Sequence, residues 1–72
     1  MNTEAVNPII QKARWVAAKL QFQGSRSLSP SERTFIAELS RRAAVHGDRT
    51  ARRLVSQIQA AHLDYQLKLD QA

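Results

Sequence analysis

The 72-residue chain has no cysteine, only two glycines and two prolines, and no long hydrophobic run. Without cysteine it cannot form a disulfide framework or a thiolate metal site. Two glycines are too few for a glycine-rich phosphate loop. The longest apolar run, Trp15 to Ala18, is far shorter than the roughly 20 residues of a spanning helix, so we expect no membrane partner. The first residues lack the basic and then apolar layout of a signal peptide, and we expect a cytoplasmic protein.

The short length also limits what the chain can do. Chains of this size bury only about 60% of their unfolded surface, so we expect one helical domain over 1–72 with frayed ends at 1–6 and 71–72. A catalytic site needs a preorganised pocket, and no nucleophile elbow or Ser-x-x-Lys pattern surrounds the serines. His46 and His62, the two histidines, are too few for a closed metal site. We therefore expect no enzyme, no cofactor and no metal.

Local signals at the start of the chain predict helices rather than strands. Asn7 can cap a helix whose first position is Pro8, where a missing N–H costs nothing. Gly24 supplies a left-handed stop for that helix. Ser29 and Glu32 form a capping box for a second helix. No sustained period-two pattern or hairpin turn is present, so the sequence predicts an all-α fold.

The second half of the chain leaves one question of topology open. Gly47 can terminate the second helix, and Asp48 can cap a third. Asp48 can instead lie within one long, bent helix, and the sequence does not decide between the two. With three helices, the expected bounds are 8–23, 30–46 and 49–70, with a linker at 24–29.

Apolar residues recur at helical spacing on more faces than a chain of this size can cover. On a wheel of about 100° per residue, the main faces lie on all three expected helices. These main faces contain Ile9, Ile10, Ala13, Val16, Ala17 and Leu20, then Phe35, Ile36, Leu39 and Ala43, then Ala51, Leu54, Val55, Ile58, Ala61, Tyr65 and Leu69. The first and third expected helices each carry a second stripe. The first contains Trp15, Ala18 and Phe22, and the third contains Ala60, Leu63 and Leu67.

The second stripes indicate contact with another chain. Soluble monomers seldom leave a large apolar patch in water, so we expect a homodimer, a protein partner, or both. Tyr65 belongs to the main stripe of the third expected helix, and we add it to the predicted interface because Tyr is enriched at binding hot spots. The predicted interface residues are Trp15, Ala18, Phe22, Ala60, Leu63, Tyr65 and Leu67. The alternative is that the first helix is central and buried, with Trp15 and Phe22 in the core.

The formal charge of +5 is concentrated in the middle of the chain. Residues 25–53 hold seven arginines against three acidic residues, whereas residues 54–72 carry a net charge of −1. A basic recognition surface for an acidic partner is predicted at Arg41, Arg42, Arg49, Arg52 and Arg53. The same residues can instead bind DNA or RNA phosphates, or remain solvated.

A helix-turn-helix motif fits this basic region poorly. With Gly47 as the turn glycine, the positions that the motif keeps apolar fall on polar or charged residues. They are Arg42, His46, Asp48, Arg53 and Ser56.

In size and layout the chain resembles the small helical regulators carried by phages and plasmids. These proteins bind a host or self protein and switch it off; some are anti-activators of transcription factors. The resemblance implies a non-catalytic protein that inhibits or modulates another protein through helix–helix contacts. The alternative is a small basic DNA- or RNA-binding protein.

Overall fold

The computed structural model describes residues 7–71, which form three α-helices and one short 3-10 helix, without a strand in this part of the chain. The elements are α1 (Pro8–Gln23), η2 (Ser25–Ser27), α2 (Pro30–Val45) and α3 (Arg49–Gln71). The predicted all-α fold class is confirmed. The ends expected to fray at 1–6 and at 72 lie outside the described residues, whereas Gln71 is helical.

α1 begins and ends where its local chemistry predicts. Asn7 caps it by accepting a hydrogen bond at Oδ1 from the N–H of Ile9, at 2.8 Å. At the other end Gly24 takes φ +82°, and its N–H donates to the carbonyl of Leu20 at 3.0 Å. The following segment is not the plain linker that we predicted, because it contains η2, in which Ser27 Oγ donates to the Gly24 carbonyl at 2.8 Å.

α2 starts with the complete capping box. The Glu32 N–H donates to Ser29 Oγ at 3.2 Å, and the Ser29 N–H donates to Glu32 Oε1 at 2.7 Å. The helix ends at Val45, one residue earlier than predicted, and His46 is its C-cap.

α2 and α3 are separate helices, which settles the question of topology. Gly47 takes φ +62°, a left-handed conformation that interrupts the helical path. Asp48 Oδ1 then accepts the N–H of Ala51 at 3.1 Å and caps α3. α3 runs to Gln71, one residue beyond the predicted end.

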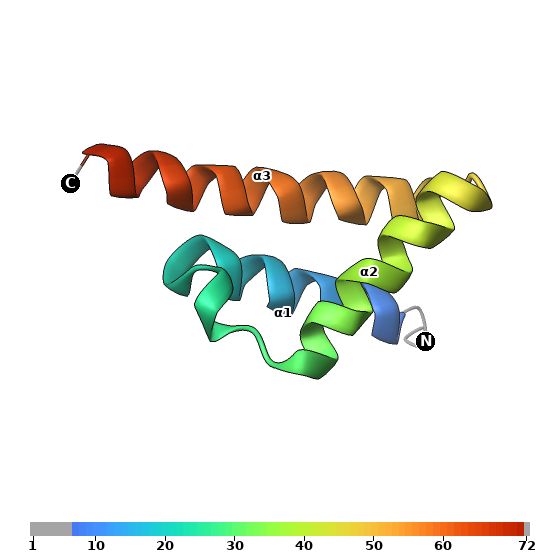
Figure 1. The fold of residues 1–72 in the computed structure, drawn as a ribbon. Coiled ribbons are helices and arrows are strands. Elements are labelled where there is room, and N and C mark those ends of the chain that lie inside the picture. Colours follow the sequence, from blue (N-terminus) through green and yellow to red (C-terminus); the bar gives the residue numbers. More distant parts are fainter. Residues whose placement is uncertain (1–6, 72) are drawn as a thin grey trace, which may run out of the picture.

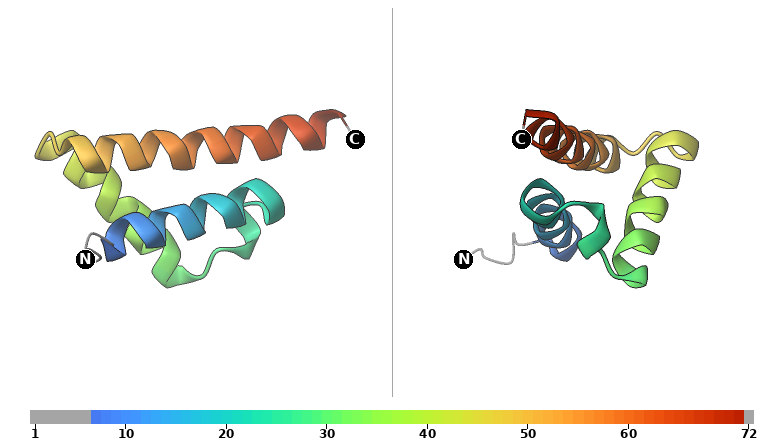
Figure 2. Two further views of the ribbon diagram at one scale, coloured as in Figure 1. Left: turned by 180° about the vertical axis from the view of Figure 1, so that it is seen from behind. Right: turned by 60° about the vertical axis from the view of Figure 1, so that its left-hand side comes forward.

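α1 and α3 lie side by side and run in the same direction, and α2 lies to one side of the pair, steeply inclined to both (Figures 1 and 2). Gln21 Nε2 donates to Asp64 Oδ2 at 3.1 Å, which ties the end of α1 to the second half of α3. The backbones of α1 and α2 each pack on α3 far more than on each other. α3 is therefore the element on which the other two helices assemble.

The core lies where these three helices meet and largely matches the predicted main faces. Its buried residues are Ala13, Val16, Leu20, Leu28, Leu39, Ala51, Leu54, Ile58 and Ala61. Leu28, from the connection between helices, was not among the predicted residues. Leu69 was predicted to belong to the main face of the third helix but is 52% exposed. The reason is that α1 ends at Gln23, whereas α3 continues beyond the residues that α1 can cover.

Candidate functional site

Four large apolar side chains of the second stripes are exposed on α1 and α3. Trp15 and Phe22 on α1 are 62% and 72% exposed, and Leu63 and Leu67 on α3 are 59% and 50% exposed. The two alanines of these stripes, Ala18 and Ala60, are also exposed. Within this chain Trp15 and Phe22 are therefore not core residues, and the core alternative is not realised.

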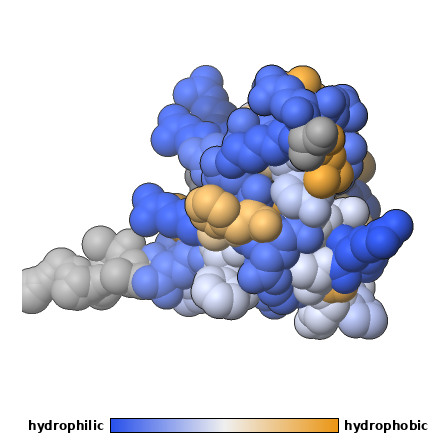
Figure 3. All heavy atoms as spheres, turned by 90° about the vertical axis from the view of Figure 1, so that its left-hand side faces the viewer, coloured by the Kyte–Doolittle hydropathy of each residue, from blue (hydrophilic) through white to orange (hydrophobic). Residues whose placement is uncertain are grey.

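These exposed residues form two surfaces rather than one. Trp15 and Phe22 project from α1, and Leu63 and Leu67 from α3, each pair on the opposite side of its helix from that helix's buried residues. At the end of the molecule that carries the C-terminus, apolar areas are separated by hydrophilic ones (Figure 3). A partner that covers one pair thus does not automatically cover the other.

Polar contacts connect α1 and α3 near these surfaces. Lys68 Nζ lies 3.4 Å from Asp64 Oδ2, the same oxygen that accepts from Gln21. The Lys68 ammonium also lies 5.7 Å from the centre of the Phe22 ring, within cation–π range. Phe22 nonetheless keeps most of its surface in contact with solvent.

Tyr65 differs from the other predicted interface residues, because the structure uses its ring inside the chain. It is half-buried and packs over Gly24. A Cβ atom added to Gly24 would lie 2.5 Å from Tyr65 Cε2 and 2.8 Å from Cζ. The ring therefore closes the contact between the end of α1 and α3.

The five predicted recognition arginines are all exposed and gather around the α2–α3 turn. Arg41 and Arg42 belong to the end of α2, and Arg49, Arg52 and Arg53 to the start of α3. Across residues 7–71 the ion pairs within 4.0 Å are Lys19–Glu32 and Lys68–Asp64, so none of the five arginines has a carboxylate partner there.

Glu32 makes an ion pair with another helix that the sequence did not predict. It is buried, and its Oε1 lies 3.0 Å from Lys19 Nζ, which joins α2 to α1. The hydrogen bond from the Ser29 N–H, together with the Lys19 ammonium, lowers the pKa of Glu32 to about 2. The group is therefore a structural anion, already paired and not available to the arginines.

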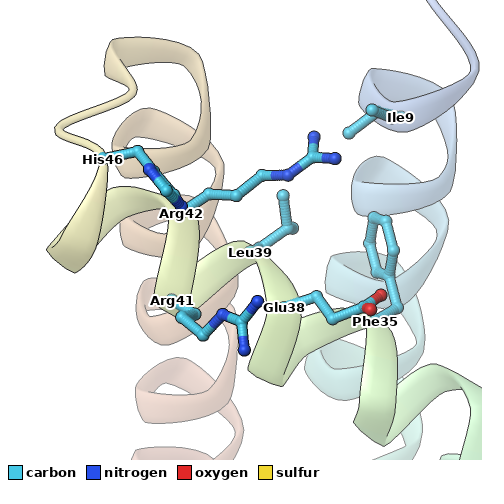
Figure 4. Close-up of a pocket in the computed structure, with 7 residues that line it drawn as sticks. All are labelled: Ile9, Phe35, Glu38, Leu39, Arg41, Arg42 and His46. Carbon is cyan, nitrogen blue, oxygen red and sulfur yellow. The ribbon is translucent and has the colours of Figure 1, made fainter.

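A shallow cavity of about 410 Å³ adjoins the basic surface between α2 and the start of α1 (Figure 4). Its apolar wall is formed by Ile9, Phe35 and Leu39. Its polar rim is formed by Glu38, Arg41, Arg42 and His46, and the Arg42 guanidinium extends over Leu39 toward Ile9. An apolar wall below two guanidinium groups suits a side chain that ends in a carboxylate.

The structure gives no support to a helix-turn-helix geometry at this turn. Positions that the motif would bury are exposed at Arg42, His46, Arg53 and Ser56, and Asp48 is only half-buried.

Residues 7–71 contain neither a cluster of metal-ligating side chains nor a membrane-spanning helix. No three His, Asp or Glu side chains come close enough together to hold a metal ion. No helix in this range combines the length and apolar character needed to cross a bilayer. His62 is half-buried, and its Nδ1 has no hydrogen-bond partner among the described residues.

The surfaces available for a function are thus the exposed faces of α1 and α3 and the arginine-rich turn. Comparison of the chain with protein-family models, with curated proteins and with solved structures finds no match.

Proposed function

We propose that this chain is a small, non-catalytic regulator that binds another protein and inhibits or modulates it by covering part of its surface. Anti-activators carried by phages and plasmids act on transcriptional regulators in this way. The observation that supports the proposal is the exposure of Trp15, Phe22, Leu63 and Leu67 on helices whose opposite faces already form the core. Large exposed apolar side chains that a chain does not need for its own packing are typical of interaction sites.

The α1 surface has the form of an anchor for a partner's groove. Trp15 and Phe22 are seven residues apart, so they lie two turns and about 10 Å apart along one side of the helix. Ala18 lies between them and leaves room for close approach of a partner's backbone. Helices that bind in grooves use large residues at this spacing, and tryptophan is among the residues most enriched at hot spots.

The arginines give the partner its expected chemistry. Five exposed guanidinium groups, none of which has a carboxylate partner within 4.0 Å among residues 7–71, create a positive field around the α2–α3 turn. Such a field speeds encounter with an acidic surface and fixes its orientation more than it raises affinity. The cavity beside Arg41 and Arg42 offers a place for one acidic side chain of that partner. The proposal involves no reaction and no cofactor, and it assigns the protein to the cytoplasm.

The test is affinity capture from the native host, followed by titration of the captured protein against purified variants. Trp15→Ala and Phe22→Ala should each weaken binding by roughly 10-fold or more, as hot-spot truncations do. Val45→Ala is the matched control, since Val45 is 69% exposed but lies on α2, outside both surfaces. The proposal is wrong if all three variants bind as tightly as the unaltered chain.

Nucleic-acid binding is the second candidate, and the observation that favours it is the five exposed arginines, which have no ion-pair partner in the part of the chain that the structure describes. Binding carried by phosphate contacts falls steeply as salt rises, with a slope of about −0.9 per phosphate neutralised on duplex DNA. A gel-shift titration across salt should then show a shallower slope for Arg52→Gln and Arg53→Gln. Absence of binding at low salt would remove this candidate and leave the protein partner.

A further inference from the structure

A continuous line of exposed residues runs along the whole outer side of α3, and we call it the outer seam. Its members are spaced by four and three residues in strict alternation, which is the spacing of a heptad seam. They are Arg49, Arg53, Ser56, Ala60, Leu63, Leu67 and Asp70, and each of them is exposed. The seam contains the predicted interface residues of the third helix except Tyr65.

The outer seam is a second face of α3, distinct from the one that forms the core. On a helical wheel at about 100° per residue its centre lies roughly 180° from the centre of the buried residues. Those buried residues are Ala51, Leu54, Ile58 and Ala61. α1 and α2 both lie on the core side of α3, and no described helix covers the opposite side (Figures 1 and 2).

The chemistry changes in order along the outer seam. The first end is basic with Arg49, the middle is small with Ser56 and Ala60, and the last part is apolar before the acidic Asp70. Across residues 7–71, neither Arg49 nor Asp70 has an ion-pair partner within 4.0 Å. The two halves of the seam are therefore complementary in charge and in side-chain size.

We propose that two copies of this chain associate through their outer seams in antiparallel orientation, with Ala60 at the two-fold axis. In this register Arg49 lies nearest to Asp70 of the second copy, and Ser56 nearest to its Leu63, each with an offset of one residue, about 1.5 Å, along the axis. Arg53 lies beside Leu67, and the two Ala60 residues face each other. The whole seam, about 32 Å from Arg49 to Asp70, is then paired.

The antiparallel orientation follows from charge and from size. A parallel pair would place Arg49 against Arg49 and Asp70 against Asp70, and like charges at facing positions are repulsive. The antiparallel pair replaces both repulsions with two symmetric ion pairs. It also sets a small Ser56 opposite a large Leu63 on each side, and two alanines at the centre let the helices approach closely. One surface is thus complementary to itself, as a two-fold interface requires.

The occupant is a second copy rather than an unrelated protein because one helix supplies both complementary halves. The inference rests on the proposed function only in treating the exposed leucines of α3 as a contact surface. Trp15 and Phe22 on α1 stay free for the regulated protein, so a dimer would present two such surfaces. A single-helix contact is smaller than a standard interface, and we expect dissociation in the micromolar range.

Disulfide trapping tests the register directly, because the chain has no cysteine of its own. Ala60→Cys alone should form a disulfide-linked dimer. Ser56→Cys and Leu63→Cys should cross-link when mixed but not when oxidised singly, because the two Ser56 residues lie about 12 Å apart along the axis and a disulfide needs Cα atoms within about 7 Å. Cross-linking of Ser56→Cys with itself would overturn the antiparallel orientation. Ala37→Cys, exposed on α2, is the control and should stay monomeric.

Sedimentation of the unaltered chain and its charge variants tests the association itself. At concentrations well above the expected micromolar dissociation constant the chain should be dimeric. Ala60→Glu should be monomeric there, whereas Ala37→Glu on α2 should remain a dimer. Arg49→Asp and Asp70→Arg should each weaken the dimer several-fold, and the double exchange should restore it. Circular dichroism of each variant shows that it is folded.

The inference is overturned if the unaltered chain is monomeric or if Ala60→Glu leaves the dimer intact. The proposed function is judged separately by Trp15→Ala and Phe22→Ala. A monomeric unaltered chain whose partner binding depends on Trp15 and Phe22 rejects only the inference. A dimeric chain whose Trp15→Ala and Phe22→Ala variants bind the partner normally rejects only the proposed function.

Discussion

The packing of Tyr65 over Gly24 predicts a large loss of stability for Gly24→Ala. The new Cβ would lie 2.5 Å from Tyr65 Cε2 and 2.8 Å from Cζ, which is closer than real Cβ contacts come. Gly24 also has φ 82° and ψ 174°, a region that side chains other than glycine's hardly enter.

The magnitude follows from these two costs. The backbone conformation costs alanine about 1–3 kcal/mol, and displacing a packed ring costs about 1–3 kcal/mol more. We therefore expect the free energy of unfolding to fall by about 2–6 kcal/mol, a large part of the roughly 4–11 kcal/mol expected for a chain of this length. Urea unfolding followed by circular dichroism measures this loss.

Gly47→Ala is the matched control for the same experiment. Gly47 also has a positive φ, +62°, but a Cβ there meets nothing within 4 Å. Gly47→Ala should therefore lower the free energy of unfolding only through its backbone conformation, by about 1–2 kcal/mol. Tyr65→Ala in the Gly24→Ala background should recover part of the loss by removing the clash. Equal losses at the two glycines, with no recovery, would refute the role assigned to Tyr65.

Three further predictions follow from burial and charge. The pKa of Glu32 is lowered from 4.5 to about 2, so its contribution to stability should be complete above about pH 4.5 and lost as pH falls through about 2, because the unfolded carboxyl takes up a proton first. Urea unfolding across that pH range should show the free energy of unfolding fall. In Glu32→Gln the part of this fall that comes from Glu32 should be absent. Leu54→Ala should cost about 2–5 kcal/mol in the same assay because Leu54 is 3% exposed. Leu69→Ala, at 52% exposure, should cost less than about 1 kcal/mol, and a similar cost for both leucines would contradict the core. Trp15 is the single tryptophan, so fluorescence of the free chain should be solvent-like and readily quenched by acrylamide. A shielded tryptophan would show that the α1 surface is not free.

The helix limits could be predicted because the signals that set them are local. Asn7, Ser29 and Asp48 each cap a helix through an N–H two or three residues away, and Gly24 and Gly47 take the positive φ that their positions imply. No tertiary contact is needed to infer any of these features. The main apolar faces could be predicted for a related reason, since periodicity depends only on the helix itself.

Features that depend on how the helices are placed relative to one another could not be predicted. The exposure of Leu69 depends on where α1 stops beside α3, and the contact of Tyr65 with Gly24 depends on the two helices being parallel. Glu32 shows a second limit, because the sequence reveals its local capping role but not the ammonium of Lys19 from another helix. Periodicity likewise reveals two apolar stripes on a helix without saying what covers the second.

Among the described helices α3 is synthesised last, and it is the one against which both others pack. The direct links between α1 and α2 are chiefly side-chain contacts, such as Lys19 with Glu32 and Lys12 over the Phe35 ring at 4.9 Å. A nascent chain that ends before Arg49 therefore has two amphipathic helices and no shared core. Such a chain exposes its apolar faces until α3 has been synthesised, so the core can form only after that point, and forms truncated before α3 should be rapidly degraded.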